Sequence, residues 1–362
     1  MDILSNFVFY FSSFLIVLTI IVFVHEFGHY YVAVLNKVKV ETFSIGFGKE
    51  IFGWNDKRGT RWKICMLPFG GYVKMFGEDI NTKEKIPYNL IKYAFSNKNV
   101  YQRFSIVLAG PLANFIFGII GFALIFSIIG KVFVPPIVNE VEKDSPAYNS
   151  GLIKDDKIIR IDNKKINNFN DIGTIINLYK NEVYNFEIER NNNIINKNVK
   201  PVSIIQEFYG QERKIYKIGI SSHEPIFKKH SFFESLYLGT QSTYQICSIT
   251  IKSLYIMLSG KGSFDDVGGP VKIAHFSGKM LEQGLLSFIN LIILLSVSIG
   301  LINLFPIPML DGGHLVLYFI EIAAGKPVNK NIQEKILKFG FVIIITLALL
   351  LTYNDIISLF KP

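Results

Sequence analysis

The chain has 362 residues, of which 50% are hydrophobic, and its mean hydropathy is +0.33. This composition is too apolar for an ordinary soluble domain and indicates a polytopic membrane protein. The net charge is +9, but the basic residues are spread over several loops, which is typical of membrane-flanking segments and argues against nucleic-acid binding. The only two cysteines, Cys65 and Cys247, exclude a disulfide framework and a cysteine-rich metal site.

The first apolar segment, Phe7–Val24, is long enough to span a bilayer and leads directly into His25-Glu26-Phe27-Gly28-His29. No basic residue precedes it and no small-residue cleavage site follows it, so we expect a retained span rather than a signal peptide. Residues i and i+4 share one face of a helix, so His25 and His29 can bind one zinc ion while Glu26 activates water. Such residues are costly in lipid, which favours a functional site over helix pairing.

Four spans are predicted, at about Phe7–Leu35, Phe104–Ile129, Leu285–Phe305 continuing toward Ile320, and Ile336–Tyr353. The charges of the loops between them predict the orientation. Residues 37–103 carry a net charge of +7 and residues 325–338 a net charge of +3, whereas residues 131–234 carry only +2. The first two loops are therefore expected in the cytoplasm, and the third loop and both termini outside.

One further segment, Phe232–Leu258, is also long enough to span. Its apolar residues alternate with Glu234, Gln241, Gln245 and Lys252, which predicts an amphipathic helix lying on the membrane or on the protein. If it did span, the following span would reverse direction. Asp311 would then lie on the opposite side of the membrane from His25.

A soluble module is predicted at about Phe133–Ser222. Its features are Ser145-Pro146-Ala147, Gly151-Leu152, the run Asp155–Asp162, a helix at Asp171–Tyr179, and strands at Tyr184–Arg190, Ile194–Val199 and Ile215–Ile220. These features resemble a PDZ domain, with Asp155 where the family pattern has glycine. A PDZ groove binds an extended peptide as an added strand; the alternative is a plain α+β domain without a ligand.

A catalytic zinc ion needs a third protein ligand and an open position for water. The candidates are His275, His314, Glu321, Asp311, Asp265 and Asp266. Asp311 stands in the segment 303–314, where two prolines and two glycines interrupt an apolar run. Irregular backbone at membrane depth is tolerated where it is buried in protein or lines a cavity. This favours Asp311, with His314 as the second choice.

The His-Glu-Phe-Gly-His motif, the run Asn-Leu-Phe-Pro-Ile-Pro-Met-Leu-Asp-Gly-Gly at 303–313, and the PDZ-like module between them resemble the site-2 protease family. The closest resemblance is to its RseP-type bacterial intramembrane zinc metalloproteases, over essentially the whole chain. The resemblance implies Zn²⁺ on His25, His29 and Asp311, with Glu26 as general base. It also implies that Asn303 binds the substrate backbone or stabilises the tetrahedral intermediate.

Two further stretches, Gly46-Phe47-Gly48 and 67–75 with Gly70 and Gly71, resemble the membrane-dipping β-hairpin loops of this family. The functional interpretation is an edge that pairs with an unwound substrate strand; the alternative is a structural hairpin that lines the cavity.

The run 109–114 offers a small-residue surface on which the first span can pack. Its last residue, Asn114, either hydrogen-bonds toward the site or only pairs helices. The run 268–271 (Gly-Gly-Pro-Val) also matches the family, without a role that its residue types reveal.

The expected fold is a polytopic α-helical membrane protein with four transmembrane helices, membrane-associated β-hairpin loops and an inserted α+β PDZ domain. The expected parts are core halves at 1–130 and 285–362, a PDZ domain at 131–222 and an amphipathic helical linker at 223–284. Well-known RseP-type enzymes have two tandem PDZ domains, whereas this module has room for one.

The resemblance implies a multi-pass protein of the inner (cytoplasmic) membrane, with its active site toward the cytoplasm and the PDZ domain on the external, periplasmic side. The implied substrates are single-span membrane proteins, such as anti-sigma factors already trimmed by another protease, or remnant signal peptides. The PDZ domain would exclude bulky ectodomains or bind a new C-terminus. The alternatives are a catalytically idle PDZ scaffold and a metal transporter.

Overall fold

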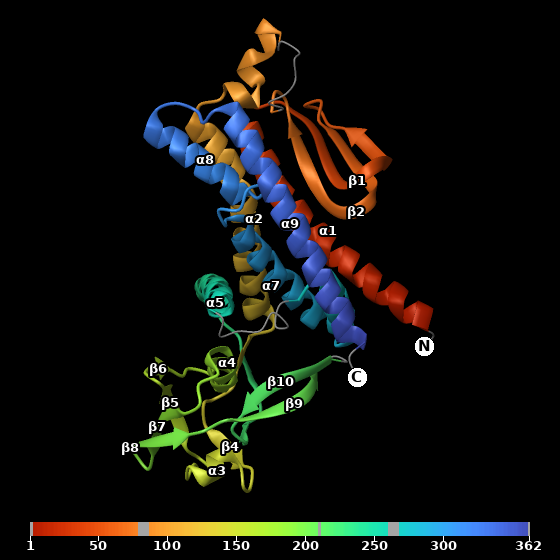
Figure 1. Cartoon of the computed structure of the whole chain (residues 1–362). Helices are drawn as coiled ribbons and strands as arrows, with labels where there is room; N and C mark the ends of the chain where they lie inside the picture. The colour runs from red at the N-terminus through yellow and green to blue at the C-terminus, as the bar shows by residue number, and fades with distance from the viewer. Residues whose placement is uncertain (1–2, 79–86, 209–210, 260–267, 361–362) are drawn as a thin grey trace. The chain divides into compact units, whose positions relative to one another are not determined.

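The computed structural model describes residues 3–78, 87–208, 211–259 and 268–360, which form two compact units (Figure 1). The first unit contains Met1–Phe122, Gly239–Ile251 and Ser263–Pro362, and the second contains Ala123–Leu238 and Lys252–Gly262. The first unit contains helices α1 (Ile3–Leu35), α6 (Pro270–Glu282), α7 (Leu285–Asn303), α8 (Asp311–Ala324) and α9 (Lys330–Phe360), and the part of α2 (Val100–Ile128) that ends at Phe122. It also holds strands β1 (Val40–Asn55) and β2 (Arg61–Met75) and the 3₁₀ helices η1 (Tyr88–Tyr93) and η2 (Phe95–Asn97).

Among the described helices, four are long and apolar enough to cross a membrane: α1, α2, α7 and α9, with mean hydropathies between 2.1 and 2.7. The predicted third span is interrupted, because α7 ends at Asn303 and α8 begins at Asp311. The amphipathic segment forms helix α5 (Phe232–Leu258), which is not among these candidate spans. The number of spanning helices therefore agrees with the prediction from sequence.

Helix α6 packs against α1. This part of the expected 223–284 linker therefore belongs to the first unit. The Tyr10 hydroxyl donates to Glu282 Oε1 at 2.9 Å, and the Tyr10 ring meets the His275 ring edge-on at 5.1 Å. Buried Asp355 of α9 accepts the backbone N–H groups of Gly269 and Lys272 at 3.1 and 3.0 Å. A carboxylate at a helix N-terminus satisfies otherwise unpaired N–H groups, so Asp355 joins α9 to the start of α6.

Strands β1 and β2 form an antiparallel hairpin that folds back on itself beside α1 (Figure 1). Phe43 of β1 pairs with Trp62 on one side and with Val73 on the other. The last part of β2, residues 71–75, is therefore an edge that pairs with β1 alone among the described strands. Burial opposes ionisation of Asp56 in the turn, but hydrogen bonds from Trp62 Nε1, the Thr60 N–H and the Tyr30 hydroxyl hold its pKa below the usual range.

The second unit contains antiparallel strand pairs around a core that includes Leu152, Ile158, Tyr184 and Phe186. Its strands are β3 (Lys131–Phe133), β4 (Val138–Val141), β5 (Lys157–Ile161), β6 (Lys164–Lys165), β7 (Tyr184–Arg190), β8 (Asn193–Val199), β9 (Val202–Phe208), β10 (Gln211–Lys217), β11 (Ile220–Ser222) and β12 (Ile226–Lys228). Helices α3 (Pro146–Asn149) and α4 (Phe169–Tyr179) complete it. The central sheet has the order β6-β5-β7-β8, and β4 pairs with β11.

The two residues of the Asp155-Asp156 pair have different structural roles. Asp155 has φ of 69°, in the left-handed region that glycine occupies freely and aspartate tolerates. Asp156 is fully buried and accepts two charge-assisted hydrogen bonds from Arg190, at 2.6 and 2.7 Å. The turn therefore keeps its shape without the glycine of the family pattern, and the buried carboxylate is compensated.

The structure corrects two predicted boundaries in this unit. Helix α4 begins at Phe169 rather than Asp171, because Asn168 and Asp171 form a reciprocal capping box around its first turn. The strand predicted at Ile215–Ile220 is two strands, β10 and β11, which pair with β9 and β4 respectively. Gly219, with φ of 76°, lies at the break between them.

Candidate metal centre

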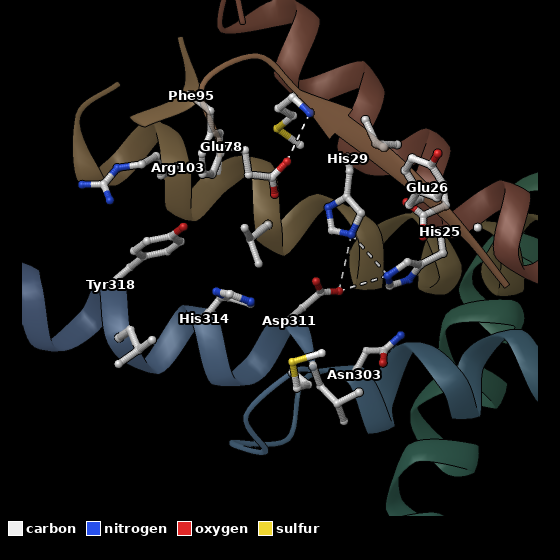
Figure 2. A pocket seen from close by; sticks show the side chains of 18 of the residues that line it. His25, Glu26, His29, Glu78, Phe95, Arg103, Asn303, Asp311, His314 and Tyr318 are labelled. Carbon is white, nitrogen blue, oxygen red and sulfur yellow. Dashed lines mark hydrogen bonds and ion pairs between the residues drawn. The ribbon is translucent and has the colours of Figure 1, made fainter. Parts of the chain in front are cut away.

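The two histidines of α1 point their Nε2 atoms toward the same space (Figure 2). His25 Nε2 lies 3.2 Å from His29 Nε2, as the i, i+4 spacing on a helix predicts. The Nδ1 of His29 lies 2.9 Å from the carbonyl oxygen of Ile106 in α2. A carbonyl can only accept, so His29 Nδ1 carries the proton and Nε2 keeps its lone pair free.

Asp311 comes to the histidines from the first residue of α8 (Figure 2). Its Oδ2 lies 3.0 Å from His25 Nε2 and 3.5 Å from His29 Nε2. The break between α7 and α8 makes this possible, because the chain folds back tightly against the start of α8. A methyl group at Gly312 would overlap the carbonyl oxygens of Leu304 and Phe305, so only glycine fits there.

These three side chains fit a zinc ion. One ligand atom from each lies within 4.8 Å of the others, and the side chains of His25 and Asp311 are only 11% and 17% exposed. Asp311 Oδ2 is buried and faces the two imidazole Nε2 atoms, with no other hydrogen-bond partner within the described chain. Two imidazole nitrogens and a carboxylate oxygen are the ligand types that zinc prefers, and three protein ligands leave a position for water.

Glu26 faces the same cavity from α1, beside the edge of β2 (Figure 2). A methyl group at Gly71 would lie 3.3 Å from Glu26 Cγ and 2.8 Å from a methyl of Val22. The edge at 71–75 thus runs next to the carboxylate. A strand with an unpaired edge can hydrogen-bond to another extended chain, which places a route for a peptide beside Glu26.

The predicted substrate-contact residues are not all equivalent in the structure. Asn303, Phe47, Gly70 and Gly71 line a cavity of about 1090 Å³ together with the metal centre. Gly46 and Gly48 do not line it; they have φ of 85° and 83° and turn β1 beside Leu67. The Phe47 ring stacks on Tyr72 with ring centroids 5.8 Å apart, which connects this turn to the cavity wall.

The remaining candidate ligands lie elsewhere or have other partners. His275 contacts Tyr10, and Glu321 forms an ion pair with Arg103 at 2.6 Å. His314 lines the cavity one turn after Asp311 but is not part of the three-residue cluster (Figure 2). The remaining two candidates, Asp265 and Asp266, lie outside the described residues.

The sequence did not reveal the polar end of the cavity. Arg103 lies 5.0 Å from the centre of the Tyr318 ring and bridges α2 to α8 through Glu321 (Figure 2). Glu78 lines the same end and accepts the backbone N–H of Met75 at 3.1 Å. These residues are far apart in the chain and follow no spacing motif. The charge of Glu321 within an apolar helix was the only local signal.

The chain is similar to known proteins over nearly its whole length. The model of peptidase family M50 matches residues 13–347. A protein of Rickettsia conorii is 41% identical over 353 residues, covering 96% of this chain and 99% of its own length. A Rhizobium meliloti protein is 36% identical, with 99% of each chain covered, and a Clostridium acetobutylicum protein is 33% identical, with 93% and 94% covered. The names of all three contain the words "zinc metalloprotease".

Proposed function

We propose that this chain, which belongs to peptidase family M50, the site-2 proteases, and is a zinc-dependent membrane metalloprotease, hydrolyses peptide bonds within or near the membrane-spanning segments of single-span proteins. The main support for this function is that Asp311 lies close to His25 and His29, next to Glu26, in a cavity bordered by a strand edge. Family membership favours an enzyme over an idle scaffold or a metal transporter.

In this proposal His25, His29 and Asp311 hold the zinc ion. When bound, zinc acidifies a water and polarises the scissile carbonyl. Glu26 accepts the proton of the attacking water and passes it to the leaving amine. The Asn303 amide, which faces the cavity from the end of α7, donates to the negative charge that develops on the carbonyl oxygen or orients the substrate backbone.

A helical substrate must unwind before its carbonyl is accessible. Each backbone hydrogen bond lost in lipid costs several kcal/mol, so an unwound segment needs new partners. The edge of β2 at 71–75 offers such partners, and Gly70 and Gly71 let the backbone approach closely. Phe47, between the turns at Gly46 and Gly48, stacks on Tyr72 of this edge. Proteolysis should therefore favour substrate segments that contain weak helix formers.

A reconstitution experiment tests this function. The purified protein in detergent should cleave a single-span substrate with a Gly-Pro pair in its span faster than a matched substrate with Ala-Leu there. Removing zinc with a chelator should abolish cleavage, and adding zinc should restore it. Equal cleavage of the two substrates would contradict the unwinding step, and full cleavage after zinc removal would contradict the metal-dependent reaction.

We further propose that the module at 131–222 is a PDZ domain on the external side of a cytoplasmic membrane, with the active site toward the cytoplasm. The positive loops at 37–103 and 325–338 support this orientation. The candidate substrates are anti-sigma factors already trimmed by another protease, or remnant signal peptides. The module would exclude bulky ectodomains or bind a new C-terminus.

A deletion tests the role of this module. Replacing residues 133–222 by a short flexible linker should leave cleavage of a trimmed substrate intact. Cleavage of the same substrate with its folded ectodomain should rise toward the level of the trimmed one. If the preference for the trimmed substrate is unchanged, the module does not select substrates by size.

A further inference from the structure

Both histidines of the metal centre are backed by the same face of α2. Ile106, Gly110 and Asn114 are four residues apart in sequence and therefore lie along one face of this helix. The Ile106 carbonyl accepts a hydrogen bond from His29 Nδ1. A methyl group at Gly110 would overlap the His29 ring and lie 3.0 Å from His25 Cε1, so the rings rest directly on this helix.

Asn114 faces Nδ1 of His25, just as the Ile106 carbonyl faces Nδ1 of His29. Its side-chain amide is fully buried, and its Nδ2 lies 3.4 Å from His25 Nδ1. The other end of the amide, Oδ1, has no hydrogen-bond partner within the described chain. A buried acceptor without a partner costs roughly 1–3 kcal/mol, so this orientation leaves the amide half satisfied.

A 180° turn of the amide exchanges its two ends and brings Oδ1, instead of Nδ2, to His25 Nδ1. Oδ1 then accepts the Nδ1–H of His25, which leaves the lone pair on His25 Nε2, the atom that faces Asp311 and His29. In the opposite arrangement Nε2 would carry a proton, and a protonated nitrogen cannot bind a metal ion. The ring nitrogen that binds the metal is set by the hydrogen bond that the other nitrogen makes.

We infer that Asn114 is a positioning residue for the zinc ion: its Oδ1 accepts the His25 Nδ1–H and holds that ring in the metal-binding tautomer and orientation. This inference rests on the proposed ligand set. The hydrogen-bond partners of the two histidines differ in a way that an experiment can use. The partner of His29 is a main-chain carbonyl that no substitution removes, whereas the partner of His25 is a side chain that mutagenesis can change.

Zinc affinity of the full-length protein in detergent measures this role without reference to proteolysis. The apoprotein of each variant is titrated with zinc in competition with a chromophoric chelator. Asn114→Leu has similar volume but no acceptor, and should weaken zinc binding about 10–100-fold, the usual effect of losing an outer partner of a metal ligand. Asn114→Asp keeps the acceptor and should bind zinc at least as tightly as the wild type.

Ser296→Ala is the matched control. Ser296 is fully buried and its hydroxyl donates to the main-chain oxygen of Asn114 at 3.5 Å, so this change disturbs the same place without touching the amide. Its zinc affinity should equal that of the wild type. Gel filtration and thermal melting of the apoproteins identify any variant that fails to fold.

The outcomes separate the inference from the proposed function. Wild-type affinity in Asn114→Leu would overturn the inference and leave Asn114 a packing residue. If Asn114→Leu does not fold, Asn114→Asp decides alone: a tenfold or larger loss of affinity would mean that the amide does not act as an acceptor. Absence of zinc binding by the wild type itself would overturn the proposed ligand set instead.

Discussion

The Glu26→Gln variant is expected to lose cleavage of a single-span substrate while it keeps its zinc. Glutamine has the same shape as glutamate but cannot accept the proton of an attacking water. General base catalysis contributes about 10²–10⁴-fold, so cleavage should fall by at least that order. Glu26 is not one of the three clustered ligand residues, so zinc binding has no reason to change.

Initial rates of cleavage in detergent, with zinc content determined for each sample, test this expectation. Glu78→Gln is the matched control, because Glu78 lines the same cavity but faces its polar end and accepts the Met75 N–H. That variant should retain most of the activity. A Glu26→Gln enzyme with wild-type rates would exclude Glu26 as the base, and one without zinc would make Glu26 a contributor to metal binding.

Much of the membrane unit could be predicted because its signals are local. A run of apolar residues long enough for a bilayer identified α1, α2, α7 and α9, and polar residues interleaved along Phe232–Leu258 indicated a helix of another kind. The i, i+4 spacing placed His25 and His29 on one face. Proline and glycine marked the break before Asp311, which the structure places between α7 and α8.

The remainder depends on contacts between distant segments, which no local pattern encodes. Asp355 capping α6 and Arg103 bridging to Glu321 each join residues at least 80 positions apart. Nothing in Gly-Gly-Pro-Val at 268–271 reveals that a carboxylate of the last helix binds there. The choice between a structural and a functional Asn114 likewise needed the position of His25 Nδ1.

Asp311→Asn is expected to abolish both zinc binding and cleavage, and His314→Gln is expected to preserve zinc binding. These two residues were the leading candidates for the third ligand, and both line the cavity. Only Asp311 brings an oxygen within 3.0 Å of His25 Nε2, and only Asp311 clusters with both histidines in the described chain. An amide oxygen is a neutral, weaker ligand, so the loss of affinity should exceed the roughly 10–100-fold effect of removing an outer partner.

Zinc stoichiometry after dialysis, followed by affinity measurement with a competing chelator, distinguishes the two residues. Retention of zinc by Asp311→Asn together with its loss from His314→Gln would make His314 the third ligand.

The zinc measurement is essential because proteolysis alone does not separate the roles. Loss of the base and loss of a ligand both stop cleavage. Glu26→Gln should stop it with the metal in place, whereas Asp311→Asn should stop it by releasing the metal. Adding excess zinc should therefore restore no activity to Glu26→Gln, while any recovery in Asp311→Asn should follow the occupancy of the site. If both variants keep their zinc, Asp311 acts on the reaction without holding the ion.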